Sequence, residues 1–325
     1  MDSTRFGKEP LRINIVLILK MPKTHIIRNK PPRKDKSFSI NSVKSLFFLT
    51  PLFFTSLFSQ SFIPTHKGEI IKHKYFTLSY IEKHEQSEWV HYLLTKEMIN
   101  GAAKRKDNFR KDPNVSTGSA SPSDYAASGY DKGHLASAAD MSLNAMSMSE
   151  SFYMTNMSPQ EPSFNRGGWK KIEELVRAWA SKTNIFVTVG GVLKKDLKKI
   201  GQGVSVPENF YKIVFNPANN SVIAFYTPNT KLASPLTKYV VSVDQIEKET
   251  GIDFLSELKD DTETQIESTI NVSNWDFNAK HTKQKASIYE NQAEKLRCSQ
   301  ILKSSGKQCS RNAKESSPFC WQHSK

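Results

Sequence analysis

The chain has 325 residues, enough for one large domain or two smaller ones, and 38% of them are hydrophobic, so a sizeable core can form. Its formal net charge of +14 favours a polyanionic partner such as nucleic acid, an acidic glycan or an anionic membrane. All three cysteines, Cys298, Cys309 and Cys320, lie beyond residue 297, which excludes disulfides and thiol chemistry from the rest of the chain.

The N-terminal part is a long basic stretch followed by a short apolar run, Leu46–Phe58. Small residues follow at Ser59 and Ser61, an order that is typical of a secretory signal peptide. Residues 1–61 are therefore interpreted as a basic segment and signal peptide, cleaved near residues 59–61, which predicts a secreted or periplasmic protein. The run is shorter than the ~20 apolar residues of a membrane span, so an uncleaved anchor is the weaker alternative. The sequence leaves open whether Met1 or Met21 is the start.

The middle of the chain has the patterns of a folded domain. Alternation and apolar runs predict strands at residues 75–80, 89–94, 185–189, 210–215, 222–226 and 240–243. Apolar spacing predicts a helix over Trp169–Ala180, and Asp244 is a candidate N-cap for a helix that ends near Gly251. Residues 101–133 are polar and predict a long functional loop. Because these elements lack a βαβ rhythm, the fold class is α+β.

We divide the chain accordingly into a domain at residues 70–262, a polar linker at 263–297 and a small Cys-rich module at 298–325.

Three residues of the domain are suited to phosphodiester cleavage, which needs a base for water and a cation to neutralise charge on the phosphate. His134 is a candidate base, since a neutral histidine takes a proton readily. Asn165, just before the predicted helix, can offer its amide oxygen to Mg²⁺, and Glu173 lies about two turns further along the same face. Each also has an ordinary structural explanation, namely a turn histidine, a helix N-cap and a solvated glutamate.

The order and spacing of these residues resemble the DNA/RNA non-specific endonucleases of the ββα-metal superfamily, which includes mitochondrial endonuclease G. The family's Asp-Arg-Gly-His signature is matched by Asp131-Lys132-Gly133-His134. Its Asn-x-x-Pro-Gln stretch is matched at 156–160, and its Asn-Arg-Gly-x-Trp metal signature at 165–169, followed by Ile172-Glu173. The likeness extends upstream to Glu88-Trp89-Val90 and to a motif at Phe109–Pro113, and downstream to Val243–Gly251.

The resemblance implies a central antiparallel sheet flanked by helices, with His134 on a hairpin and Asn165 on the helix of a ββα finger. It implies that His134 is the general base and that Asn165 is the single direct protein ligand of Mg²⁺ or Mn²⁺. Glu173 would hydrogen-bond the metal's waters, Asn156 would orient the phosphate or His134, and Arg166 would lie near the scissile phosphate.

Two positions depart from the family pattern. Lys132 replaces the usual arginine, which keeps the charge but loses bidentate phosphate contact. Some members place a transition-state arginine two residues before the aromatic of the Phe109 motif, where this chain has Asp107. Arg105 or Arg110 is the candidate substitute, and Arg105 ranks first.

The C-terminal module has the ligand set of a structural zinc site, with Cys298, Cys309, Cys320 and a final Cys-x2-His ending at His323. So short a module cannot bury enough core to fold without a staple, and an odd cysteine count with a nearby histidine favours Zn²⁺. The alternative is one disulfide with a free cysteine, which a secreted context favours. The module is basic and is expected to add DNA affinity.

The sequence thus predicts a secreted Mg²⁺-dependent endonuclease that hydrolyses DNA and RNA with little sequence specificity, through contacts to the phosphate backbone. No small-molecule cofactor is expected, and a homodimer is left open. The alternatives are a non-catalytic nucleic-acid-binding protein and a nuclease toxin delivered to competitors. The presence of His134, Asn165 and Glu173 together favours catalysis.

Overall fold

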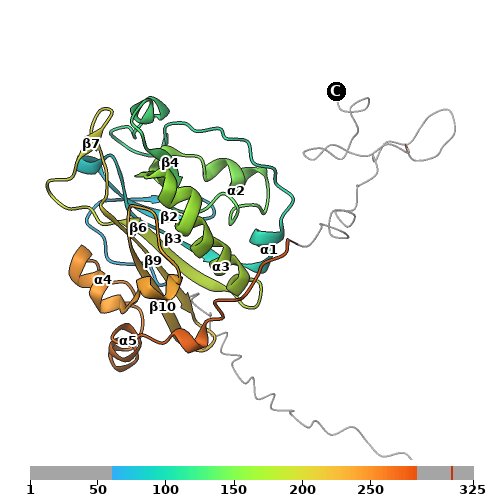
Figure 1. Ribbon diagram of the computed structural model, residues 1–325. Coiled ribbons are helices and arrows are strands. Elements are labelled where there is room, and N and C mark those ends of the chain that lie inside the picture. Colours follow the sequence, from blue (N-terminus) through green and yellow to red (C-terminus); the bar gives the residue numbers. More distant parts are fainter. Residues whose placement is uncertain (1–60, 284–308, 310–325) are drawn as a thin grey trace, which may run out of the picture. The chain divides into compact units, whose positions relative to one another are not determined.

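The computed structural model describes residues 61–283 and Cys309 (Figure 1). The predicted signal peptide, apart from Ser61, lies outside the described residues, as do residues 284–297 of the predicted linker. Of the predicted zinc ligands, Cys298, Cys320 and His323 also lie outside them. Within the described part of the chain, no helix combines the length and the apolar character that crossing a membrane would require.

A seven-stranded antiparallel sheet forms the centre of the domain, as predicted, in the order β1-β2-β3-β6-β9-β10-β11 (Figure 1). The strands are β1 (Glu69–Lys72), β2 (Thr77–Ile81), β3 (Gln86–Leu94), β6 (Ile185–Gly191), β9 (Asn209–Asn216), β10 (Ser221–Pro228) and β11 (Val240–Val241). Six of them coincide with the predicted strands to within a few residues at each end, and β1 was not predicted. Long apolar runs are the strand signal that a sequence shows most clearly.

Side chains that alternate along each strand form two apolar cores, one on each face of the sheet. On β9, Phe210 belongs to the core that packs under α3 (Lys170–Ala180), whereas Tyr211 belongs to the opposite core. That second core is covered by α4 (Val243–Thr250) and α5 (Asp260–Glu267). The helix α3 and the pair α4–α5 therefore lie on different faces of the sheet.

The remaining elements are short. Two further helices and two small hairpins complete the domain: α1 (Lys96–Asn100), α2 (Ala145–Glu150), β4 (Asp131–His134) with β5 (Met157–Gln160), and β7 (Lys199–Ile200) with β8 (Val204–Ser205). Single 3-10 turns occur at Glu82–His84, Pro122–Tyr125, Met154–Asn156, Leu236–Tyr239 and Val272–Asn274. The loop predicted at residues 101–133 contains one such turn and ends at residue 130, because β4 begins at Asp131.

The start of α4 differs from the prediction. The Ser242 side chain accepts a hydrogen bond from the backbone N–H of Gln245 at 3.2 Å, so Ser242 is the N-cap and Asp244 lies inside the first turn. This cap also ends β11 at Val241, two residues before the predicted strand end. The helix ends at Gly251, as predicted, because that residue adopts φ +65°, which glycine allows without strain.

The folded domain extends beyond both predicted boundaries. Phe62 is 3% exposed and its ring lies 5.0 Å from that of Phe186. Trp275, within the predicted linker, is 6% exposed and packs at 4.8 Å from Trp179, whose indole N–H donates to the Asp276 carbonyl. Residues 263–283 are thus part of the domain rather than a free linker, because buried aromatic rings outweigh a polar average composition.

Candidate active site

The predicted motifs meet in a strand–strand–helix unit. The strands β4 and β5 pair antiparallel, and one helical turn at Phe164–Trp169 leads directly into α3. Glycine is needed in the middle of β4, because a Cβ at Gly133 would lie 2.2 Å from the side chain of Gln160 on β5. Since residues two apart on a strand share a face, Lys132 and His134 point to the same side of this hairpin.

That side opens into a cavity of about 360 Å³. Its lining includes the predicted metal ligand and all but one of the predicted catalytic residues: Arg105, Lys132, His134, Asn165, Arg166 and Glu173. Lys170 and Arg177 add two further cations. Five cationic side chains against one carboxylate give the cavity a positive potential, which suits a polyanionic substrate.

His134 has the environment of an unprotonated base. Its Nε2 is buried and has no hydrogen-bond partner, while its ring packs edge-on against Phe152 at 4.9 Å and beside Phe109 at 5.7 Å. Burial in this aromatic setting, and then the charge of Arg105, lower the pKa of His134 to about 3. The imidazole is therefore neutral across the physiological pH range.

Asn165 is oriented by a carboxylate. Its Nδ2 donates to Asp131 Oδ2 at 2.9 Å, which leaves the amide oxygen directed away from Asp131. Arg166 donates to both oxygens of the same carboxylate, at 2.8 and 2.5 Å. Burial alone would raise the pKa of Asp131, but the hydrogen bonds from Arg166 and Asn165 outweigh it and lower the pKa. Asp131 thus holds both motif residues in place from the neighbouring strand.

Glu173 lies on α3 with its carboxylate enclosed by charged neighbours. Burial raises its pKa to about 7, an effect that Lys212 and Arg177 partly offset. Arg177 is one turn further along the same helix, is 9% exposed, and bonds Asp140 Oδ1 at 2.9 Å. The charge state of Glu173 near neutral pH therefore depends on cations placed around it.

A family model for DNA/RNA non-specific endonucleases matches residues 55–261, which include every residue that lines this cavity. The chain belongs to this family. It is therefore a nuclease, a hydrolase that acts on phosphodiester bonds, and metal dependence is typical of the family.

Known relatives agree with this assignment. A nuclease of Nostoc sp. is 37% identical over 218 residues, which cover 62% of this chain and 78% of that protein. A nuclease of Serratia marcescens is 30% identical, covering 61% and 79%, and human mitochondrial endonuclease G is 29% identical, covering 55% and 67%. A solved structure of EndoG in complex with EndoGI superposes with a TM-score of 0.54 at 26% identity, covering 59% of this chain and 88% of that one.

In this nuclease Asn156 is not part of the cavity lining. It is fully buried, and its side chain accepts from the N–H of Ala136 at 2.8 Å and donates to the carbonyls of Ala136 and Ser151 at 2.9 and 2.8 Å. These bonds hold the backbone that follows His134. Of its two expected roles, orienting His134 through the backbone fits these contacts, whereas no contact fits a role at the phosphate.

The two candidate arginines occupy different places. Arg105 lines the cavity, with its guanidinium 5.0 Å from the Phe152 ring and its Nε 2.6 Å from Asp107. Arg110 instead stacks on Tyr153 at 3.9 Å and donates to the Ser149 carbonyl at 2.9 Å. Arg105 therefore lies at the candidate site, whereas Arg110 stabilises the surrounding loop through its contacts to Ser149 and Tyr153.

Sequence reasoning missed the buried polar layer beneath Glu173. Tyr92 donates to Asp140 Oδ2 at 2.8 Å, on the carboxylate that also binds Arg177. Lys212 on β9 is fully buried, and its Nζ lies 4.8 Å from the Trp169 ring with no hydrogen-bond partner. Burial lowers the pKa of Lys212, and the charge of Glu173 opposes that shift. The sequence feature that could have indicated this layer is a single lysine, Lys212, within an otherwise apolar strand.

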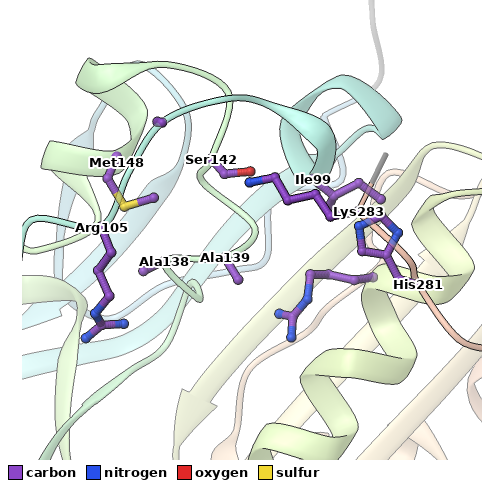
Figure 2. Close-up of a pocket in the computed structure, with 10 residues that line it drawn as sticks. Ile99, Arg105, Ala138, Ala139, Ser142, Met148, His281 and Lys283 are labelled. Atoms are coloured by element: carbon purple, nitrogen blue, oxygen red, sulfur yellow. The ribbon is translucent and has the colours of Figure 1, made fainter. Parts of the chain in front are cut away.

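A second cavity of about 390 Å³ adjoins the first, and Arg105, Ala138, Ala139 and Arg177 line both. Figure 2 shows Arg105 at one end of this cavity and His281 with Lys283 at the other. The last two residues come from beyond residue 261, where the family match ends.

Proposed function

We propose that this nuclease cleaves DNA and RNA endonucleolytically with little sequence preference, with His134 as its general base and Asn165 as its metal ligand. The observation that carries the proposal is one cavity lined both by a neutral imidazole, that of His134, and by the Asn165 amide that Asp131 orients. Cations that line the cavity suit contacts to phosphates, which are common to every sequence and to both nucleic acids.

The donor set fits a hard divalent cation. Mg²⁺ takes oxygen ligands and keeps several waters, so one amide oxygen from Asn165 and a water-mediated contact to Glu173 are sufficient protein contacts. Both residues line the same cavity. A bound Mg²⁺ or Mn²⁺ supplies charge neutralisation at the phosphate and the leaving oxygen.

The chain's own residues do the rest. His134, as a neutral imidazole that lines the cavity, takes the proton from the attacking water. Arg105 and Lys132 bind the phosphate oxygens, with Lys132 acting as a point charge because it lacks the fork of an arginine. Arg166 is already paired with Asp131, so it approaches the phosphate as a positioned rather than a free cation.

A plasmid-nicking assay on residues 62–325 tests this proposal, with Mg²⁺ and with a chelator. His134→Ala should lower the rate at least ~10²-fold, and Asn165→Ala should lose Mg²⁺-dependent activity while DNA binding remains. Glu173→Ala should be less severe because it acts through water. Unchanged metal dependence in Asn165→Ala, or near-wild-type cleavage by pure His134→Ala, would remove the mechanism.

We also infer that the bound strand continues from the catalytic cavity into the second one, toward His281 and Lys283. The two cavities adjoin at Arg105, which lines both, and Lys283, which lines the second cavity, offers a phosphate contact beyond it (Figure 2). Lys283→Ala should weaken DNA binding and reduce its salt dependence by about one released counterion, with the rate at saturating DNA unchanged. The control is Lys248→Ala, an exposed lysine on α4 across the sheet, and equal effects of the two variants would refute the path.

Secretion and the zinc module belong to the same proposal. Cleavage near residues 59–61 would leave the packed Phe62 within the mature protein, in keeping with a signal peptide before it. Cys298, Cys309, Cys320 and His323 are proposed to hold one structural Zn²⁺. Mass spectrometry of the exported protein tests both, since it reports the mature N-terminus, the bound metal and any disulfide.

A further inference from the structure

Five carboxylates gather on the face of the sheet opposite the α3 core. The helix α4 carries Asp244 and Glu247, α5 carries Glu263 and Glu267, and Asp253 lies in the segment that connects them. Spacings of three and four residues place each helical pair on one side of its helix. The packing of α4 against α5 then turns the two sides toward each other.

The carboxylates are close enough to share an ion. One oxygen each from Asp244, Glu247 and Glu267 lie within 4.8 Å of one another, and so do oxygens of Asp253, Glu263 and Glu267. Glu267 belongs to both sets. It is 6% exposed, and its Oε1 is buried with no hydrogen-bond partner. A buried acceptor left unpaired costs roughly 1–3 kcal/mol, so its retention indicates a missing partner.

No cation of the described domain compensates this cluster. The ion pairs recorded within residues 61–283 involve none of the five carboxylates. In a chain with a net charge of +14, the cluster is thus a local concentration of negative charge.

We propose that this acidic cluster is a structural Ca²⁺ site in which Glu267 bridges the two sets of carboxylates. Ca²⁺ accepts six to eight oxygen ligands in flexible geometry, including bidentate carboxylates, whereas Mg²⁺ keeps much of its water shell. The ion would tie α5 to α4. That tie matters because Ile266 is the one hydrophobic side chain of α5, and it is only partly buried. It also holds a helix that lies almost wholly beyond residue 261, where the family match ends.

The test is thermal unfolding of the full chain, freed of divalent ions, with added CaCl2 or MgCl2. The measurement is made in the Asn165→Ala variant, so that metal binding in the catalytic cavity does not contribute to the change in Tm. Ca²⁺ at a hundredfold over its Kd should raise Tm by about 5–10 °C, and MgCl2 at the same concentration should raise it far less. Glu267→Gln should abolish the Ca²⁺ response, and so should Glu263→Gln, which keeps the test valid if the buried substitution unfolds the domain.

The matched control is Asp261→Asn, an exposed carboxylate on the same helix that should leave the Ca²⁺ response unchanged. In the otherwise wild-type chain, Glu267→Gln should leave Mg²⁺-dependent nicking intact, so this site and the catalytic proposal fail separately. No rise in Tm with CaCl2, an equal rise with MgCl2, or an undiminished rise in both cluster variants would overturn the calcium site.

Discussion

Replacing Asp131 by alanine is the most direct test of how Asn165, the proposed metal ligand, is held. The Asp131 carboxylate accepts one hydrogen bond from Asn165 at 2.9 Å and two from Arg166. In Asp131→Ala the amide of Asn165 loses the partner that distinguishes its nitrogen from its oxygen. The side chain can then rotate, and part of the population presents Nδ2 rather than Oδ1 to the metal.

The size of the effect follows from one interaction. The Arg166 side chain is 72% exposed, so its pairing with Asp131 is screened by water and contributes little to stability. The Asn165 bond ends on a charged, largely buried carboxylate, and such a bond contributes roughly 1.5–3 kcal/mol. At about 1.4 kcal/mol for each factor of ten, the apparent Mg²⁺ affinity should fall roughly 10- to 150-fold.

The assay is the nicking rate as a function of Mg²⁺ concentration, with Tm as a check on folding. We expect the half-saturating Mg²⁺ concentration to rise by this factor, while much of the rate returns at saturating Mg²⁺. Asp107→Ala is the matched control, because Asp107 also pairs with a cavity arginine, Arg105, but has no contact with Asn165. An unchanged Mg²⁺ requirement in folded Asp131→Ala, or an equal change in the control, would refute the positioning role.

Three further predictions concern His134, the two candidate arginines and the C-terminal module. Burial lowers the pKa of His134 from 6.5 to about 3, so below about pH 6.5 the unfolded chain binds a proton that the folded chain does not. As the pH is lowered through this range, the free energy of unfolding should therefore decrease more steeply in the wild type than in His134→Ala; urea titrations at several pH values measure this, and equal slopes would contradict it. Arg105→Ala should slow cleavage at saturating DNA, whereas Arg110→Ala should mainly lower Tm because it loses the Ser149 bond and the Tyr153 stack; the reverse pattern would exchange their roles. Deleting residues 290–325 should leave Mg²⁺-dependent nicking largely intact but weaken DNA binding and remove about one Zn²⁺ per chain, which nicking, binding and elemental analysis would each report.

Local order along the chain was enough to find the motifs that carry the candidate site residues. His134, Asn165 and Glu173 belong to short motifs that can be recognised from neighbouring residues alone, without knowledge of the rest of the fold. All three line the cavity. The central strands were readable for a similar reason, because a strand buried on both faces shows as an apolar run. The helix end at Gly251 followed from glycine's freedom at positive φ.

Other parts of the site depend on contacts between residues far apart in the sequence. Arg105 and Arg110 are equivalent by composition, and only the path of the loop carries one to the cavity and the other onto Tyr153. Trp275 lies in a polar segment, and it is part of the core because its ring packs against that of Trp179 on α3.

The same holds for the charged layer under Glu173 and for the acidic cluster at Glu267. Lys212 and Glu267 are each one charged residue among many in the sequence, and neither belongs to a motif. Burial is what makes them distinctive, because removing a charge from water magnifies its interaction with every neighbour. Burial is decided by which elements pack together, so the sequence determined the chemistry of the motifs, whereas the tertiary structure decided which charges surround them.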